Sequence, residues 1–268
     1  MNFESLGGKR GVSVEGDTVV KIQEPGASRK ERLRTEAGHE VGRQTGLFRV
    51  PEIVAFDDSR GRIVFERLQL TGIRECLSKA GRSMDLAGRA AGVLAAIHSR
   101  MVPGDGTGKA NSSAVGIGLA RRTVPLHGDF GMRNIFCIGD SDDLVVIDWA
   151  NADWIGVDAD LGAPELDVAV FLISLFHRRL FGPWPITRRH EVARRFLRTY
   201  ASVSPWGLDV DTLRSVVSAT RAGFNEGTRR AKGYLRALAY RPSMIDLQLF
   251  LRRLSEQDFA GQPERQRG

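Results

Sequence analysis

The sequence predicts an α+β fold with two lobes: a small, strand-rich lobe over residues 1–70 and a larger, mainly helical lobe over residues 71–268. Three observations lead to this prediction. Up to about Gly72, short runs alternate apolar and polar side chains and are separated by turn residues, which is typical of β-strands. Beyond it, apolar side chains recur at three- and four-residue intervals, which indicates helices. A length of 268 residues also suits two lobes around a cleft.

The elements of the first lobe follow from its alternation and its turns. Strands are predicted at residues 12–14, 18–22, 50–54 and 62–65. The first two are separated by the turn Glu15-Gly16-Asp17, which predicts a β-hairpin. The polar segment 28–46 predicts a helix that ends near Gly46.

The second lobe begins with a helix, predicted from apolar residues that share one face: Leu86, Ala90, Val93, Leu94 and Ile97. Glycine, proline and serine are frequent in residues 102–113, which predicts a loop. Residues 126–148 then predict a loop, a strand, a turn and a second strand. Further helices are predicted at residues 187–201, 211–224 and 242–258.

Composition narrows the classes of function. The longest apolar run, Val168–Phe176, is far too short to cross a bilayer and predicts a buried helix. Residues 1–10 contain no apolar segment of the kind that directs export, so we expect a cytoplasmic protein without a membrane partner. Cys76 and Cys137 lack the spacing of metal ligands and are interpreted as reduced core thiols.

The net charge of +7 raises the question of an anionic partner. The 39 basic residues, only six of them lysine, are spread along the chain rather than gathered in one tract. In the densest stretch, residues 228–241, the aromatic residues do not alternate with the charges in a stacking pattern. Nucleic-acid binding is therefore not favoured, and a solvated arginine-rich surface is the preferred interpretation.

One segment carries a pattern of polar residues that suggests chemistry. The triplet His127-Gly128-Asp129 is followed by Asn134, and fourteen residues later an apolar strand ends in Asp148. Phosphoryl transfer needs a group that orients or deprotonates the attacking hydroxyl. It also needs hard oxygen ligands for the Mg²⁺ that neutralises the phosphates. Asp129 suits the first need. Asn134 and Asp148 suit the second, because two strands joined by a turn would bring them to the same end of a hairpin.

If Asp129 and Asp148 were ordinary turn aspartates, His127 and Asn134 would remain unexplained. The segment instead resembles the aminoglycoside phosphotransferase and choline kinase family, whose signature is His-Gly-Asp, four residues, Asn, and a later Ile-Asp-Trp or Ile-Asp-Phe. The resemblance extends over about residues 5–175 and implies a bilobal, protein-kinase-like fold. It also implies ATP and Mg²⁺ as cofactors and transfer of the ATP γ-phosphate to a hydroxyl of a small molecule.

The resemblance implies roles for individual residues. Asp129 corresponds to the catalytic group, and Asn134 and Asp148 correspond to the magnesium ligands. His127 and Asp167 are expected to give structural support, Asp167 by bracing the backbone of the catalytic loop.

On the ATP side, Lys21 looks like the strand lysine that reaches the phosphates. Glu36 looks like the helix glutamate that pairs with this lysine, and Glu40 on the same helix is the competing partner. The resemblance also implies a hinge at residues 64–70, where Glu66 and Leu68 would meet adenine, and it adds Ile147 to the ATP-binding residues.

The sequence gives the least information about the acceptor of the phosphoryl group. Asp153 and Asp158, with Asp160 and Glu165, follow Asp148 closely and predict an acidic wall that favours a cationic acceptor such as an aminosugar. The net charge of +7 favours an anionic acceptor, but exposed charges act mainly within about 10 Å. The identity and charge of the acceptor, the choice between ATP and GTP, and the oligomeric state stay open.

Two other hypotheses stand beside the small-molecule kinase. The first is an atypical protein serine/threonine kinase; Gly131 argues against it, because those enzymes usually carry lysine two residues after the catalytic aspartate. Asp129-Phe130-Gly131 does spell the protein-kinase metal motif, but residues 103–115 contain no histidine for the catalytic loop that should precede it. The second is a nucleotide-binding regulator without turnover, which would not need Asp129.

Overall fold

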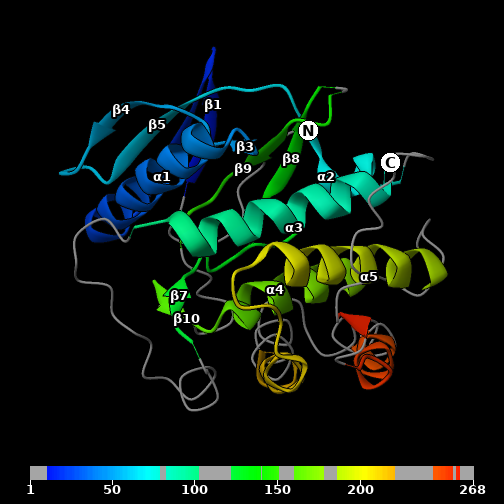
Figure 1. Ribbon diagram of the computed structural model, residues 1–268. Helices are drawn as coiled ribbons and strands as arrows, with labels where there is room; N and C mark the ends of the chain where they lie inside the picture. The colour runs from blue at the N-terminus through cyan, green and yellow to red at the C-terminus, as the bar shows by residue number, and fades with distance from the viewer. Residues whose placement is uncertain are drawn as a thin grey trace, which may run out of the picture.

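The computed structural model describes residues 11–78, 83–102, 122–139, 141–150, 160–177, 186–220, 244–255 and 258–259. Within these ranges, most strands come from the N-terminal part of the chain and helices dominate from α3 onward (Figure 1). The α+β fold class with a strand-rich first part and a helical second part is therefore confirmed.

The first sheet has the strand order β1-β2-β5-β4, and all its neighbouring strands are antiparallel. Its strands are β1 (Gly11–Glu15), β2 (Thr18–Ile22), β4 (Ile53–Asp57) and β5 (Arg62–Glu66). The predicted hairpin is confirmed: Glu15 pairs with Thr18 across Gly16, whose φ of 59° is a conformation that glycine adopts without strain. The strand predicted at residues 50–54 begins three residues late. Pro51 lacks the N–H that a strand interior requires.

Helix α1 (Pro25–Thr45) lies along the first sheet (Figure 1). It starts three residues before the predicted position, because proline is well suited to the first helical turn, where its missing N–H has no partner to lose. It ends at Gly46 as predicted, where a φ of 65° lets the glycine N–H bond to the Gly42 carbonyl. Its buried residues are Ser28, Glu31, Arg34, Thr35, Gly38, Val41 and Gly42.

A second sheet, with the order β3-β9-β8-β6, joins distant parts of the chain. Its strands are β3 (Phe48–Arg49), β6 (Leu70–Gly72), β8 (Ile135–Ile138) and β9 (Leu144–Val146). The β8–β9 hairpin was predicted. β3 and β6 were not, because strands this short show no detectable alternation. Residues 67–69 carry the chain from the first sheet to the second, and a lobe boundary at residue 70 stays a prediction.

The rest of the described chain is mainly helical. Its elements are α2 (Ile73–Cys76), α3 (Ser83–Arg100), the strand pair β7 (Val124–Pro125) and β10 (Leu161–Gly162), α4 (Pro164–Phe176) and α5 (Ile186–Val203), with further helical residues at 210–220 and 244–252. The helices predicted for this region are thus present, although the last ends at residue 252 rather than 258. The loop predicted at 102–113 lies almost entirely outside the described residues.

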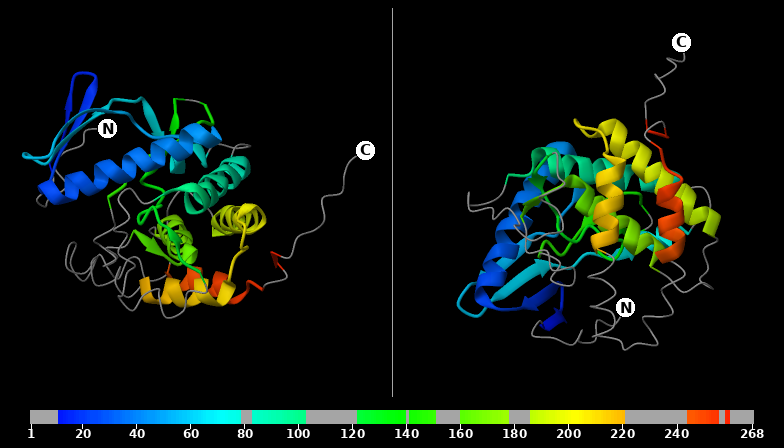
Figure 2. Two further views of the ribbon diagram at one scale, coloured as in Figure 1. Left: turned by 60° about the vertical axis from the view of Figure 1, so that its left-hand side comes forward. Right: turned by 90° about the horizontal axis from the view of Figure 1, so that it is seen from below.

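Helix α4 is buried over nearly its whole length, as its apolar run predicts. The left view of Figure 2 shows α3, α4 and α5 packed below α1 and the first sheet. Phe171 of α4 stacks on Phe196 of α5 with 3.8 Å between ring centroids. This helical core supports the loop that precedes β8 from below.

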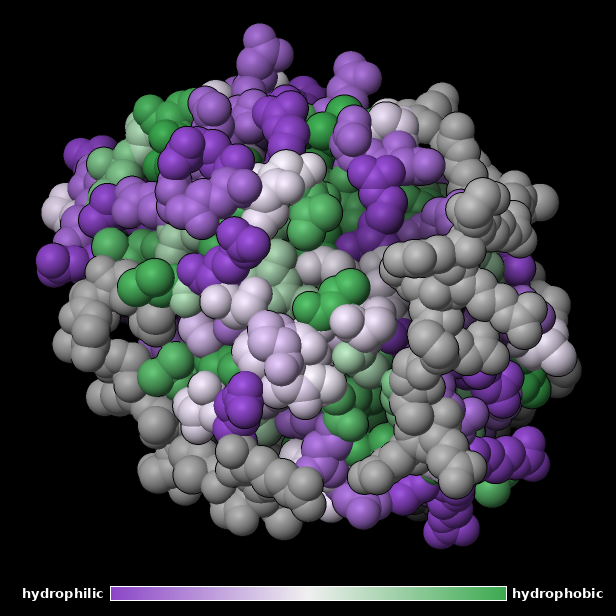
Figure 3. Space-filling view, viewed as in Figure 1, coloured by the Kyte–Doolittle hydropathy of each residue, from purple (hydrophilic) through white to green (hydrophobic). Residues whose placement is uncertain are grey.

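The outer side of α1 and the neighbouring β4–β5 region are strongly hydrophilic (Figure 3). There, α1 carries the exposed ion pairs Arg32–Glu36 and Arg43–Glu40. The solvated side of α1 thus faces away from its buried polar residues, which lie close to the candidate site.

Among the described helices, none combines the length and the apolar character needed to cross a bilayer.

Candidate active site

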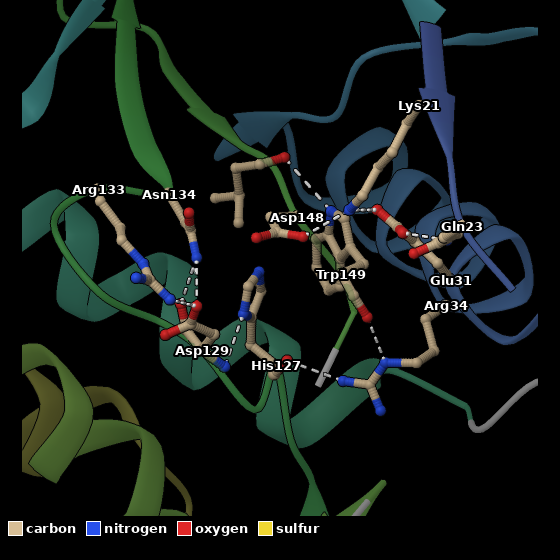
Figure 4. A network of polar contacts seen from close by, with 11 residues as sticks. Lys21, Gln23, Glu31, Arg34, His127, Asp129, Arg133, Asn134, Asp148 and Trp149 are labelled. Carbon is tan, nitrogen blue, oxygen red and sulfur yellow. Dashed lines mark hydrogen bonds and ion pairs between the residues drawn. The ribbon is translucent and has the colours of Figure 1, made fainter. Parts of the chain in front are cut away.

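The β8–β9 hairpin places the two predicted metal ligands at the same end, as expected from the sequence. Ile135 pairs with Val146, and the N–H of Ile147 donates to the carbonyl of Asn134 at 3.0 Å. Asn134 therefore immediately precedes β8, and Asp148 follows β9 beside it (Figure 4).

Asp148 has a left-handed backbone, with a φ of 59°, and in the described part of the chain it is the only non-glycine residue with positive φ. This conformation costs about 1–2 kcal/mol for a residue with a Cβ atom. The bend points the Asp148 carboxylate toward Lys21, whereas Trp149 enters the core (Figure 4). Backbone strain of this kind gathers at functional sites, and no sequence pattern signalled it here.

Asp129 is buried and held by two donors on the same loop. Its Oδ2 accepts hydrogen bonds from Asn134 Nδ2 at 2.9 Å and from Arg133 Nη2 at 2.5 Å. Asn134 Nδ2 also donates to the Asp129 carbonyl, which leaves the side-chain oxygen of Asn134 turned away from Asp129 (Figure 4). Burial raises the pKa of Asp129 to about 6, although Arg133 and Asn134 favour the carboxylate.

Asp167, in the first turn of α4, holds the backbone that precedes Asp129. Its Oδ2 accepts the N–H of His127 at 2.7 Å, and its Oδ1 accepts the N–H of Gly128 at 2.9 Å. These bonds fix the turn at Gly128, where φ is 81°. The bracing contact expected of Asp167 is present, and His98 Nε2 lies 3.1 Å from the same carboxylate.

His127 supports the loop from inside. Burial lowers the pKa of His127 to about 4, so its ring is neutral near pH 7. Its Nδ1 accepts the N–H of Asp129 at 3.2 Å, and its ring lies 4.6 Å from that of Trp149, between centroids. His127 thus makes its contacts within the core of the loop, and its supporting role stays a prediction.

Lys21 on β2 pairs with Glu31, and the predicted pairing with Glu36 is wrong. Lys21 Nζ lies 2.6 Å from Glu31 Oε1 and 2.8 Å from Asp148 Oδ1. Glu36 lies on the solvated side of α1 and pairs with Arg32, and the alternative partner Glu40 is also exposed. Glu31 belongs to the buried face of α1, whose three- and four-residue spacing, extended to Gly38 and Val41, is the signal that identifies it.

The charges of this group depend on one another. Burial disfavours the charged form of Lys21, but the carboxylates of Glu31 and Asp148 raise its pKa above the ordinary value. Burial would raise the pKa of Asp148, but Lys21 and, more weakly, Arg133 hold it below its usual range. Gln23 Nε2 donates to the second oxygen of Glu31 at 2.6 Å and fixes that carboxylate. The lysine is thus a fixed cation beside Asp148.

We expect Glu31→Gln to lower kcat/KM for ATP by about 10- to 100-fold, which corresponds to the loss of one charge-assisted hydrogen bond to Lys21. Glu36→Gln is the matched control on the same helix and should change kcat/KM less than about twofold, because Glu36 is exposed. Steady-state kinetics of ATP consumption measures both. Equal effects of the two substitutions would contradict the assignment of Glu31.

Arg34 links α1 to the loop and hairpin of the site, and sequence reasoning missed it. The side chain is buried, and its Nε donates to the Trp149 carbonyl at 2.7 Å. Its Nη2 donates to the carbonyls of Leu126 and His127 at 2.6 and 2.8 Å, and its Nη1 pairs with Asp160. One guanidinium thus satisfies three backbone carbonyls, which needs the planar donor fork of arginine.

We expect Arg34→Lys to lower the free energy of unfolding by about 1.5–3 kcal/mol, since a lysine keeps the charge but cannot reach all these acceptors. Arg32→Lys, on the exposed side of the same helix, should change it by less than about 0.5 kcal/mol. Urea denaturation of the two variants provides the comparison. A loss of stability for Arg34→Lys no larger than for Arg32→Lys would mean that the guanidinium contacts are dispensable.

Gly38 allows α1 to approach this region closely. A Cβ atom at Gly38 would lie 2.4 Å from Cζ2 of Trp149, far inside van der Waals contact. The indole of Trp149 therefore packs directly on the helix backbone, next to the ring of Phe48. This contact and Arg34 together fix α1 against the segment that carries Asp148.

No protein-family model and no curated protein matches the sequence. Solved structures do match the fold. Choline kinase LicA from Streptococcus pneumoniae aligns over 91% of each chain with a TM-score of 0.53 and 13% identity. The GDP complex of aminoglycoside 2'-phosphotransferase-IIIa aligns over 96% of this chain and 91% of its own, with a TM-score of 0.53 and 14% identity. The gentamicin complex of APH(2")-IIa aligns over 96% of this chain and 92% of its own, with a TM-score of 0.52 and 15% identity.

The chain has the bilobal fold of the kinase-like phosphotransferases. Identities of 13–15% establish this fold and leave the chemistry to the geometry of the site. Within the fold, Glu66 ends β5, and its carboxylate accepts the N–H of Glu52. Leu68 lies in the connection between the two sheets, and Ile147 is half-buried beside Asp148. ATP-binding roles for Glu66, Leu68 and Ile147 stay predictions.

The predicted acidic wall of the acceptor pocket is only partly described. Asp153 and Asp158 lie outside the described residues. Asp160 pairs with Arg34 and Lys30, and Glu165 accepts the N–H of Asp209. Both carboxylates make internal contacts, and their place in an acidic wall of the acceptor pocket stays a prediction.

The donor set at the end of the hairpin fits Mg²⁺. The described residues hold no cluster of three or more His, Cys, Asp or Glu side chains suited to a metal ion. Mg²⁺ does not need one, because it commonly binds one or two protein oxygens together with substrate phosphates and water. Asn134 offers a carbonyl oxygen turned away from Asp129, and Asp148 offers a carboxylate that is partly exposed.

Proposed function

We propose that this protein is an ATP- and Mg²⁺-dependent phosphotransferase that moves the γ-phosphoryl group to a hydroxyl of a small molecule. One observation carries the proposal: Lys21, which is distant in sequence, meets the segment of Asp129, Asn134 and Asp148 at one end of the β8–β9 hairpin. A lysine, two oxygen ligands and a buried carboxylate are the groups that phosphoryl transfer requires. Neighbours with this fold are named choline kinase and aminoglycoside phosphotransferase, which supports the reaction class.

Each residue has a distinct task in this proposal. Asp129 orients the acceptor hydroxyl and accepts its proton as the acceptor oxygen bonds to the γ-phosphorus. The bond between that phosphorus and the β–γ bridging oxygen breaks, and ADP leaves. Lys21, held by Glu31, contacts the phosphates. Asn134 and Asp148 would hold Mg²⁺, which supplies neutralisation of phosphate charge when bound.

The remaining assignments complete the proposal. The adenine would lie at the connection after β5, near Glu66, Leu68 and Ile147. Asp153 and Asp158 are proposed for one side of the acceptor pocket, and the acceptor is of the aminoglycoside, sugar or amino-alcohol type. The cytoplasm, which supplies ATP and Mg²⁺, is proposed as the place of the reaction.

The test combines nucleotide binding with a transfer screen. Thermal stability is measured with ATP, with and without Mg²⁺, and ATP consumption is followed with panels of aminosugars, amino alcohols, sugars and nucleosides. A stabilisation by ATP that requires Mg²⁺, together with acceptor-dependent ADP release, supports the proposal. Binding without any turnover across the panels would favour the nucleotide-binding regulator, and no binding would overturn both.

A further inference from the structure

Arg133, immediately before Asn134, has its guanidinium beside Asp129 at one side of the site, and the proposed reaction gives it no task so far. Its Nη2 lies 2.5 Å from Asp129 Oδ2. The arginine side chain is 61% exposed, whereas that of Asp129 is only 3% exposed. The exposed side chain of Arg133 thus brings its positive charge to the buried carboxylate of Asp129.

Two cations flank the proposed transfer site from opposite sides. Figure 4 shows Lys21 approaching Asp148 from β2 and Arg133 approaching Asp129 from the loop, with Asn134 and Asp148 between them. Lys21 is already fixed by Glu31 and Asp148. Arg133 is the cation beside Asp129, the residue proposed to orient the acceptor hydroxyl.

We propose that Arg133 is a catalytic residue that binds the phosphoryl group while it passes from ATP to the acceptor. This inference rests on the proposed function. A phosphoryl group between the hairpin end and Asp129 comes within reach of a guanidinium that already touches Asp129. The planar fork of arginine binds two phosphoryl oxygens at once, and an exposed side chain adjusts to them without disturbing the core. The bonds made and broken are those of the transfer described above.

A purely structural ion pair would behave differently. The arginine end of this pair is exposed to solvent, and Asn134 still donates to Asp129 Oδ2 when Arg133 is replaced, so the pair contributes little to folding. Removing the Arg133 charge should therefore leave thermal stability nearly unchanged. The substitution should weaken binding of a complex that mimics the phosphoryl group during transfer, and it should leave binding of ADP alone nearly unchanged.

The test uses ADP, Mg²⁺ and aluminium fluoride, which forms a planar mimic of the transferring phosphoryl group and needs no identified acceptor. Calorimetric titrations compare the wild type, Arg133→Gln and Arg133→Lys with Arg43→Gln. Arg43 is an exposed arginine paired with Glu40 on α1 and is the matched control. We expect aluminium fluoride to tighten binding of Mg·ADP to the wild type and to Arg43→Gln.

For Arg133→Gln, we expect Mg·ADP affinity within about twofold of the wild type and a loss of at least about tenfold in the tightening by aluminium fluoride. Arg133→Lys should keep part of the tightening by aluminium fluoride, since the positive charge remains. Equal tightening in Arg133→Gln and the wild type, or none in the wild type, overturns the role of Arg133 while leaving nucleotide binding intact. Failure of the wild type to bind Mg·ADP overturns the proposed function as well.

Discussion

Asp148→Ala is expected to abolish Mg²⁺-dependent nucleotide binding and to lower turnover by about 10³-fold or more. The carboxylate is the only charged group of the proposed metal pair, and metal neutralisation of the phosphates is worth several kcal/mol in phosphoryl transfer. The substitution also removes a partner of Lys21. Calorimetric titration with a non-hydrolysable ATP analogue, with Mg²⁺ and with EDTA, measures the loss directly, and ATP consumption measures turnover.

Two further variants separate the carboxylate from other causes. Asp143→Ala removes an exposed carboxylate from the same hairpin and should leave binding and turnover within about twofold. Asp148→Gly removes the carboxylate but suits the φ of 59° at this position. If glycine restores binding that alanine loses, the defect of Asp148→Ala arises from the backbone, and the metal assignment is wrong.

Asp129→Asn is expected to lower turnover by about 10²–10⁴-fold, the range for a positioned acid–base group, while ATP affinity changes less than about twofold. Asparagine keeps the size of the side chain but cannot accept the acceptor proton. Turnover and equilibrium binding of ATP, measured on the same preparation, distinguish the two quantities. A comparable loss of ATP affinity would place Asp129 on the metal instead.

The pH dependence of the wild type gives an independent check on Asp129. Because burial raises its pKa to about 6, the carboxyl is protonated below this pH and cannot accept a proton. Turnover should therefore rise with pH around 6 and level off above about pH 7. Asp129→Asn should lack this acid limb. A wild-type rate that is constant from pH 5 to 8 would contradict a proton-accepting role for the buried carboxyl.

The local part of the site was predictable from the sequence, because short spacings dictate it. His127, Asp129 and Asn134 lie on one tight loop, and the apolar runs on either side of a turn predict the hairpin that carries Asp148. A carboxylate in the first turn of α4, Asp167, reaches back to this loop as expected. In each case few residues separate the partners, or a continuous apolar run identifies the element.

The contacts between elements were not predictable in the same way. Which glutamate meets Lys21 depends on which face of α1 turns inward, and in this polar helix only the spacing of Glu31 to Gly38 and Val41 marks that face. A buried arginine such as Arg34 is rare, so its sequence position suggests solvent exposure. The left-handed backbone of Asp148 and the ion pair of Arg133 with Asp129 arise from packing and loop geometry, which no periodicity encodes.

The contacts of Arg34 have a consequence for regulation. An outward swing of α1 would carry Glu31 away from Lys21, but it would also pull the guanidinium from three buried carbonyls and from Asp160. Those acceptors would be left without donors in the interior, at a cost of about 1–3 kcal/mol each. These contacts therefore couple the helix to the loop and oppose a swing that would separate Glu31 from Lys21. The proposed phosphotransferase would therefore need no separate activating step that brings this helix inward.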